Sequence, residues 1–155
     1  MIAVVQRVSE GKVVVDGSVV GQCGEGLFVL LGVAAGDTEE DARLLCDKIV
    51  KMRIFSDENG KMNLALGDVG GEMLVVSNFT LLASYRKGNR PDYMNSAPPD
   101  EAKRLYEAFI AMAKESVPHV GEGIFGADMK VTITNDGPVT IPMDSNVLKQ
   151  PKNKH

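Results

Sequence analysis

Tryptophan is absent from this chain of 155 residues, and cysteine and histidine occur only twice each. Two cysteines, Cys23 and Cys46, are too few for a disulfide framework, and both lie in apolar segments, so the sequence predicts buried free thiols. Neither cysteine has a CxxC partner, and one of the two histidines, His155, is the last residue. We therefore expect no metal site, no cofactor and no histidine that acts as a general base.

Long apolar runs are missing too. The longest one, residues 27–35, is far shorter than the roughly 20 residues that a membrane-spanning helix needs. The first residues lack the basic and apolar regions of a signal peptide, so we expect a cytoplasmic protein with no membrane partner. The net charge of −4 argues against a general polyanion binder, so DNA is not an expected partner and any contact with RNA must be local.

The composition, 44% hydrophobic and 25% charged, is typical of a soluble globular domain. No linker or repeat interrupts residues 1–147, so we expect one domain there, followed by a polar, basic tail at residues 148–155.

The hydrophobic pattern predicts several strands and two main helices. Helices are expected after Asp37, whose side chain would cap the first turn with Glu40 three residues later, and after Pro98 and Pro99. Strands are expected at residues 2–8, in a hairpin over 12–22 turned by Asp16 and Gly17, at 26–33, from 53, at 72–82, and as a pair at 131–134 and 139–141. This pattern predicts an α+β fold with mostly antiparallel sheets in a layered, barrel-like arrangement and both helices packed on one side.

One familiar motif is present without its context. Residues 121–126, GEGIFG, match the GxGxxG pattern, but a dinucleotide site needs a strand before it and a helix after it. Here the segment follows a helix and leads into a strand, so we expect turn glycines. His119, just past the second helix, fits a surface position better than a catalytic one.

Three polar segments are better candidates for a functional site. In the first, Asn78 and Thr80 would share one face at the end of an apolar strand, where they either satisfy local backbone groups or take part in chemistry. In the second, residues 134–140 form either a plain hairpin turn or, around Gly137 and Pro138, a rigid backbone shape suited to steric sorting.

The third segment is a loop that combines cations and aromatics. Arg86, Lys87 and Arg90 lie between Tyr85 and Tyr93 in a chain that is acidic as a whole. The loop is either simply solvated or contacts RNA phosphates, with a tyrosine available for stacking on a base.

Together these segments resemble the bacterial-type D-aminoacyl-tRNA deacylase family over residues 1–145. The family's two signatures, a Ser-Gln-Phe-Thr-Leu strand and an Asn-x-Gly-Pro-x-Thr turn, appear here as SNFTL at 77–81 and NDGPVT at 135–140. RIFSDENGKMNLAL, KGNRP and FGADMKV are similar in kind and order. Asn78 replaces the usual glutamine, which shortens the reach of the amide, and Tyr85 and Asp92 also depart from the family pattern.

The resemblance implies an enzyme that hydrolyses the ester between tRNA and a D-amino acid or glycine, as a homodimer with its active site at the subunit interface. The residues that it implicates are catalytic Ser77, Asn78, Phe79 and Thr80; pocket residues Phe125, Gly126, Ala127, Met129 and Asn135; and a cis Gly137–Pro138 wall, lent by the partner subunit, that rejects L-amino acids. Backbone N–H groups near Phe79 and Thr80 would stabilise the oxyanion, and the 2′-hydroxyl of the terminal adenosine would help to activate water. Arg86, Lys87 and Arg90 would contact the 3′ end of aminoacylated tRNA.

Two alternatives stay open at this point. One is a related deacylase with a trans Gly-Pro turn and relaxed chirality, and the other is an RNA-binding dimer without catalytic activity.

Overall fold

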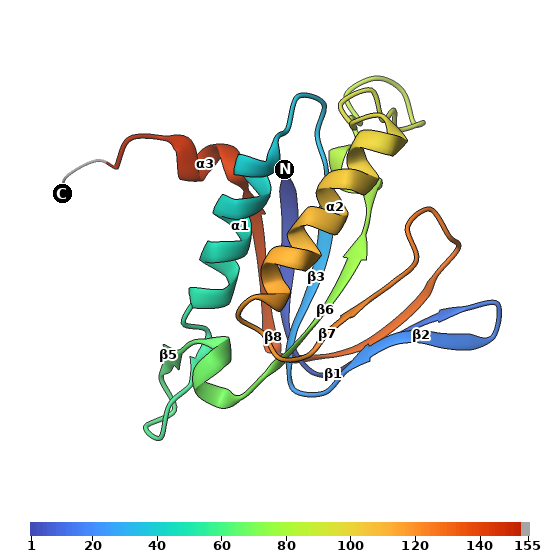
Figure 1. Cartoon of the computed structure of the whole chain (residues 1–155). Helices are drawn as coiled ribbons and strands as arrows, with labels where there is room; N and C mark the ends of the chain where they lie inside the picture. Colours follow the sequence, from blue (N-terminus) through green and yellow to red (C-terminus); the bar gives the residue numbers. More distant parts are fainter. Residues whose placement is uncertain (153–155) are drawn as a thin grey trace.

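Strand β1 organises the sheet of this protein, whose computed structural model describes residues 1–152. β1 (Ile2–Val15) is antiparallel to β2 (Ser18–Cys23), β3 (Gly26–Gly32) and β8 (Lys130–Asp144). β6 (Glu72–Ser77) and β7 (Val120–Glu122) continue the sheet in parallel pairing, in the order β2-β1-β3-β6-β7 with β8 on the other side of β1 (Figure 1). The sheet is therefore mixed.

Two glycines let the sheet curl until β2 approaches β7. A Cβ atom on Gly21 would clash with the carbonyl of Glu122, and one on Gly121 would lie 2.6 Å from the carbonyl oxygen of Gln22. Only residues without a side chain allow the two backbones to come this close. The result is a nearly closed, barrel-like sheet, and the predicted α+β class is confirmed.

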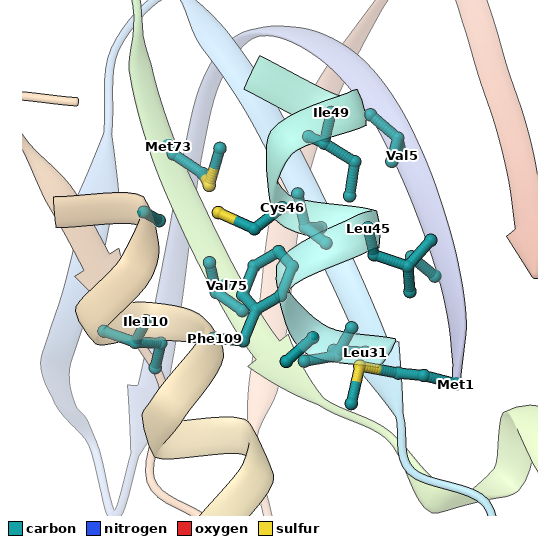
Figure 2. Packing of buried hydrophobic residues seen from close by; sticks show 14 of the residues in the cluster. Met1, Val5, Leu31, Leu45, Cys46, Ile49, Met73, Val75, Phe109 and Ile110 are labelled. Carbon is teal, nitrogen blue, oxygen red and sulfur yellow. The ribbon is translucent and has the colours of Figure 1, made fainter. Parts of the chain in front are cut away.

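The helices α1 (Glu39–Lys51) and α2 (Pro99–Lys114) cover one side of this sheet (Figure 1). Side chains of both helices, including Leu45, Ile49 and Phe109, pack on the sheet around Val5, Met73 and Val75 (Figure 2). Met73 and Val75 belong to β6. Leu74 and Val76 of β6 point to the opposite face of the sheet and join a second apolar cluster inside the barrel. Since alternate residues face two cores, all four central residues of β6, 73–76, are apolar and buried.

Several smaller elements complete the fold. These are β4 (Phe55–Ser56), β5 (Met62–Leu64), the 3-10 turns η1 (Leu66–Val69) and η2 (Phe79–Leu82), and the short helix α3 (Ser145–Lys149). No helix within residues 1–152 is long and apolar enough to cross a membrane. Both cysteines are buried, and burial raises the pKa of each thiol to about 11.

The predicted hairpin turn is present, with positive φ angles at Asp16 and Gly17. Other boundaries were predicted incorrectly. Thr38 and Asp41 cap α1, in place of the expected Asp37 and Glu40. The strand expected over 72–82 ends at 77, and the expected pair at 131–134 and 139–141 is one long strand, because both halves of β8 pair with β1 instead of with each other.

The start of the expected tail is ordered. Helix α3 runs through Lys149, whose ammonium lies 2.8 Å from the carboxylate of Asp41. Asp41 is buried and also accepts a hydrogen bond from the Ser145 hydroxyl at 2.7 Å. Burial alone would raise the pKa of Asp41, but these contacts and the Thr38 N–H hold it well below its usual range. Residues 153–155 lie outside the described part of the chain.

Candidate functional site

A cavity of about 820 Å³ opens where β6 ends. Four segments that are distant in sequence form its walls: residues 30–33, residues 76–79, residues 93–99 with the first turns of α2, and residues 125–131. Its lining is mainly apolar, with polar side chains contributed by Ser77, Asn78, Tyr93, Ser96 and Tyr106. A cavity of this size can hold a drug-sized or nucleoside-sized ligand.

Seven of the residues selected from the sequence lie together here. They are Ser77, Asn78, Phe79, Phe125, Gly126, Ala127 and Met129. The end of β6 and the start of η2 contribute the first three, and the segment between β7 and β8 contributes the other four. The cavity is thus formed within a single chain.

Asn78 ends β6 by capping the next turn. Its side-chain oxygen accepts hydrogen bonds from the Thr80 N–H, at 3.2 Å, and from the Thr80 hydroxyl. Asn78 and Thr80 are therefore not two parallel side chains of one strand, as the alternation had predicted. Thr80 is exposed and does not line the cavity, whereas Asn78 does.

This cap changes which backbone donors are free. The Thr80 N–H, one of two groups expected to stabilise an oxyanion, is already bonded to Asn78. Within residues 1–152 the Phe79 N–H has no such partner. Because the Asn78 oxygen accepts both Thr80 donors, the Asn78 nitrogen keeps its two N–H groups available at the cavity wall.

The wall made by residues 93–99 and α2 was missed at the sequence level. The Tyr93 ring packs edge-on against Phe79 with ring centroids 5.0 Å apart, and the Ser96 hydroxyl donates to the Phe79 carbonyl at 3.3 Å. Buried Tyr106 donates to the Val75 carbonyl at 3.1 Å and lies against Phe125. Burial raises the pKa of Tyr106 above its usual range, so the phenol stays protonated.

Asn135, Gly137 and Pro138 do not line this cavity. Asn135 still pairs with Val8 of β1, whereas residues 136–139 interrupt the pairing of β8 with β1, and the Gly137-Pro138 peptide bond is cis. Asn135 braces the interruption, since its oxygen accepts from the Val139 N–H at 3.3 Å and its nitrogen donates to the Thr140 hydroxyl at 3.0 Å. Gly137 and Pro138 are exposed.

Arg7 supports this turn from behind, a role that no sequence pattern indicated. Its guanidinium donates to the carbonyl of Asp136 at 3.2 Å and to the carbonyl of Ile54 at 2.8 Å. Only 12% of its side chain is exposed; the contact with Ile54 is partly buried, whereas the contact with Asp136 lies at the surface. Arg7 therefore ties the Gly137–Pro138 turn to the chain segment that enters β4.

The loop with Arg86, Lys87 and Arg90 projects next to the cavity. Ser84 and Asp92 exchange backbone hydrogen bonds of 2.8 and 2.9 Å at its neck, which places the loop between η2 and Tyr93. The three cations are exposed, and none forms an ion pair within the described part of the chain.

Within the described chain, the residues that line the cavity include no Asp, Glu, His, Lys or Arg. Among residues 1–152 no group of three His, Cys, Asp or Glu side chains is arranged to hold a metal ion. His119 lies outside the cavity, with its Nε2 atom 2.8 Å from the carbonyl oxygen of Gln22 and 3.2 Å from Glu72. The cavity can therefore orient a largely apolar ligand through a few neutral hydrogen-bonding groups.

Comparison with known proteins places these features in one family. The sequence profile of the family described as D-Tyr-tRNA(Tyr) deacylase matches residues 4–144. A D-aminoacyl-tRNA deacylase of Anaeromyxobacter dehalogenans is 57% identical over 148 residues, covering 96% of this chain and 99% of the relative. One from Roseiflexus castenholzii is 52% identical over 155 residues, covering 100% and 99%.

Solved structures agree on the fold. A structure titled c-Myc DNA Unwinding Element Binding Protein superposes with a TM-score of 0.88 at 39% identity and covers 93% of this chain and 98% of its own. A probable eukaryotic D-amino acid tRNA deacylase gives a TM-score of 0.81 at 17% identity, covering 92% and 98%. The chain belongs to the D-Tyr-tRNA(Tyr) deacylase family, whose members are hydrolases that act on ester bonds.

Proposed function

We propose that this protein hydrolyses the ester of D-aminoacyl-tRNA and of glycyl-tRNA, with the terminal aminoacyl-adenosine bound in the cavity. The observation that carries the proposal is the meeting of the SNFTL and FGADM segments across one cavity. The names of the relatives, at more than 50% identity over nearly the whole chain, point to the same reaction.

The chemistry needs little from the protein beyond positioning. An aminoacyl ester is already activated, and the adenosine 2′-hydroxyl helps to activate the attacking water. The backbone N–H of Phe79 and the side-chain NH2 group of Asn78 supply donors for the developing oxyanion. Thr80 is a poor nucleophile. Its hydroxyl donates a hydrogen bond to the amide oxygen of Asn78, and an amide oxygen is too weak a base to deprotonate it.

Chirality is read by a second copy of the chain. Gly137 and Pro138 are exposed and lie outside their own cavity, which fits a turn that enters the cavity of a partner subunit. There its carbonyl oxygens face the α-carbon of the substrate, leave room for hydrogen or a D-side chain, and clash with an L-side chain. Glycine has no side chain to exclude, so glycyl-tRNA passes the same filter.

The tRNA backbone is held by the neighbouring loop. Arg86, Lys87 and Arg90 are exposed and without ion-pair partners in the described chain, so they are free to contact phosphates.

A deacylation assay tests the proposal. We expect rapid release of tRNA from D-Tyr-tRNA and Gly-tRNA, while L-Tyr-tRNA stays intact. Hydrolysis of both tyrosine enantiomers at similar rates would identify a relaxed-chirality deacylase. Retention of tRNA without any hydrolysis would identify an RNA-binding dimer and refute the proposed reaction.

A further inference from the structure

Tyr85 is the most exposed aromatic residue of the described chain. Its side chain is 85% exposed, compared with 58% for Phe79 and 37% for Tyr93. Tyr93 is used within the fold, where its ring edge packs on Phe79. Tyr85 has no aromatic partner among residues 1–152, and its exposure leaves most of the ring accessible to a ligand.

The surroundings of Tyr85 favour a polyanion. Arg86, Lys87 and Arg90 follow it within six positions, although the whole chain carries a net charge of −4. The carboxylate of Asp92 accepts the Met94 N–H at 3.3 Å and forms no ion pair with these cations in the described part of the chain. An exposed ring beside unpaired cations is the combination that binds single-stranded nucleic acid, with stacking on bases and charge on phosphates.

The neck of the loop fixes Tyr85 relative to the cavity. Tyr85 directly follows Ser84, which pairs with Asp92 through two backbone hydrogen bonds. On one side the neck continues from η2, and on the other it leads into Tyr93 and Met94, which line the cavity. Met94 is 88% exposed, so apolar surface extends from the cavity mouth toward the loop.

We propose that Tyr85 stacks on the base of a nucleotide that precedes the terminal adenosine in the single-stranded 3′ end of tRNA, while the adjacent cations hold its phosphates. This inference rests on the proposed function, since it requires the terminal aminoacyl-adenosine to occupy the cavity. It assigns Tyr85 to binding of the RNA strand and not to the chemistry of the ester.

Kinetics on two substrates tests this role. Replacement of Tyr85 by alanine should lower kcat/KM for D-Tyr-tRNA by roughly 5-fold or more, mainly through KM, which is the scale of one lost stacked base. The same variant should hydrolyse D-tyrosyl-adenosine at the wild-type rate, because that substrate has no preceding nucleotide. Tyr85→Phe keeps the ring and should restore kcat/KM on tRNA to near the wild-type value.

Equal losses on both substrates would show that Tyr85 acts on the fold or the cavity, and an unchanged KM on tRNA would show that it is only solvated. Either result overturns the stacking role. A wild-type protein that hydrolyses neither substrate would instead overturn the proposed function, so the two failures are distinguishable.

A direct probe is available because the chain has no tryptophan. Tyr85→Trp introduces the only indole, and its fluorescence should be quenched when deacylated tRNA with an intact 3′ end binds. tRNA trimmed of its three terminal nucleotides should leave the fluorescence unchanged at concentrations where the intact tRNA quenches it. Equal quenching by both RNAs would place the ring against the duplex and contradict the proposal.

Discussion

The cavity is lined entirely by one chain, whereas the Gly137–Pro138 turn is exposed and lines no part of that cavity. The cavity is formed by four segments of one chain that meet around Ser77, Asn78 and Phe79. The turn is exposed, is braced by Asn135 and by Arg7, and contributes nothing to the cavity of its own subunit. The proposed binding surface and the proposed steric wall therefore lie in different places on the chain, and a function that uses both needs two chains.

Mixing two damaged variants tests this division with the largest expected effect. Ala127→Trp fills the cavity, and Gly137→Val places a side chain where φ is +126° and where even a Cβ would crowd Arg7. We expect each variant to lose deacylation or enantiomer selection when it is alone. After subunit exchange, half of the dimers carry one intact cavity facing one intact turn, which restores about a quarter of the selective activity.

The outcome against a shared site is equally clear. If the mixture performs no better than the sum of its parts while native mass spectrometry shows that mixed dimers have formed, the turn does not serve the partner's cavity. A stable monomer that hydrolyses D-Tyr-tRNA selectively would lead to the same conclusion.

Arg7 offers a smaller perturbation that should affect the turn alone. Arg7→Ala removes charged hydrogen bonds to the carbonyls of Asp136 and Ile54, an interaction of about 1.5–3 kcal/mol for each typical bond to a charged group. We expect the ratio of D-Tyr-tRNA to L-Tyr-tRNA hydrolysis to fall by roughly 10-fold or more, with binding of uncharged tRNA unchanged. Arg53→Ala, which replaces an exposed arginine directly before Ile54, serves as the matched control. Unchanged selectivity in Arg7→Ala would show that the turn holds its shape without this residue.

Asn78 tests the cavity in the complementary way. Asn78→Ala removes the cap of η2, which costs about 1 kcal/mol, and takes away an amide donor at the wall. We expect kcat to fall several-fold while D/L selectivity stays at the wild-type value. Thr80→Ala should keep substantial activity, because it removes no group that lines the cavity. Complete inactivity of a folded Thr80→Ala protein would instead support a nucleophilic threonine.

The same contrast explains what the sequence could predict. The turn at Asp16 and Gly17 and the helix after Pro98 and Pro99 depend on local residue chemistry, and both are present. The long strand β8 was missed because Asn135, Asp136 and Gly137 carry a strong local turn signal, which pairing with β1 along both halves overrides. Closure of the barrel depends on Gly21 and Gly121 meeting the opposite strand, and no local pattern reveals such a contact.

The candidate site follows the same rule. The residues within family-like motifs could be selected from the sequence, and most of them meet in the cavity. Tyr106 could not, because a helical stripe does not distinguish a side chain that faces the core from one that faces a cavity. Arg7 could not, since its partners lie 47 and 129 positions away.

Asp41, remote from both regions, should have the smallest effect on activity and a clear effect on acid stability. Its pKa is held below the model-compound value of 3.8 by Lys149, Thr38 and Ser145. Below about pH 4 the Asp41 carboxylate is therefore protonated in the unfolded chain before it is protonated in the folded protein. Its contribution to the free energy of unfolding is full above about pH 5 and declines as the pH falls through 4 and below. Asp41→Asn should be less stable than wild type to urea at pH 7, and this difference should shrink at pH 3.

The exposed carboxylate of Glu40, one position earlier on α1, provides the control for that measurement. Glu40→Gln should leave the urea midpoint nearly unchanged at both pH values, and both variants should retain wild-type D/L selectivity at pH 7. If Asp41→Asn altered selectivity in a fully folded protein, α1 and α3 would be coupled to the turn through β8, whose last residue Asp144 directly precedes α3. In that case the selectivity proposed for the turn would depend on α1 and α3 as well as on the turn itself.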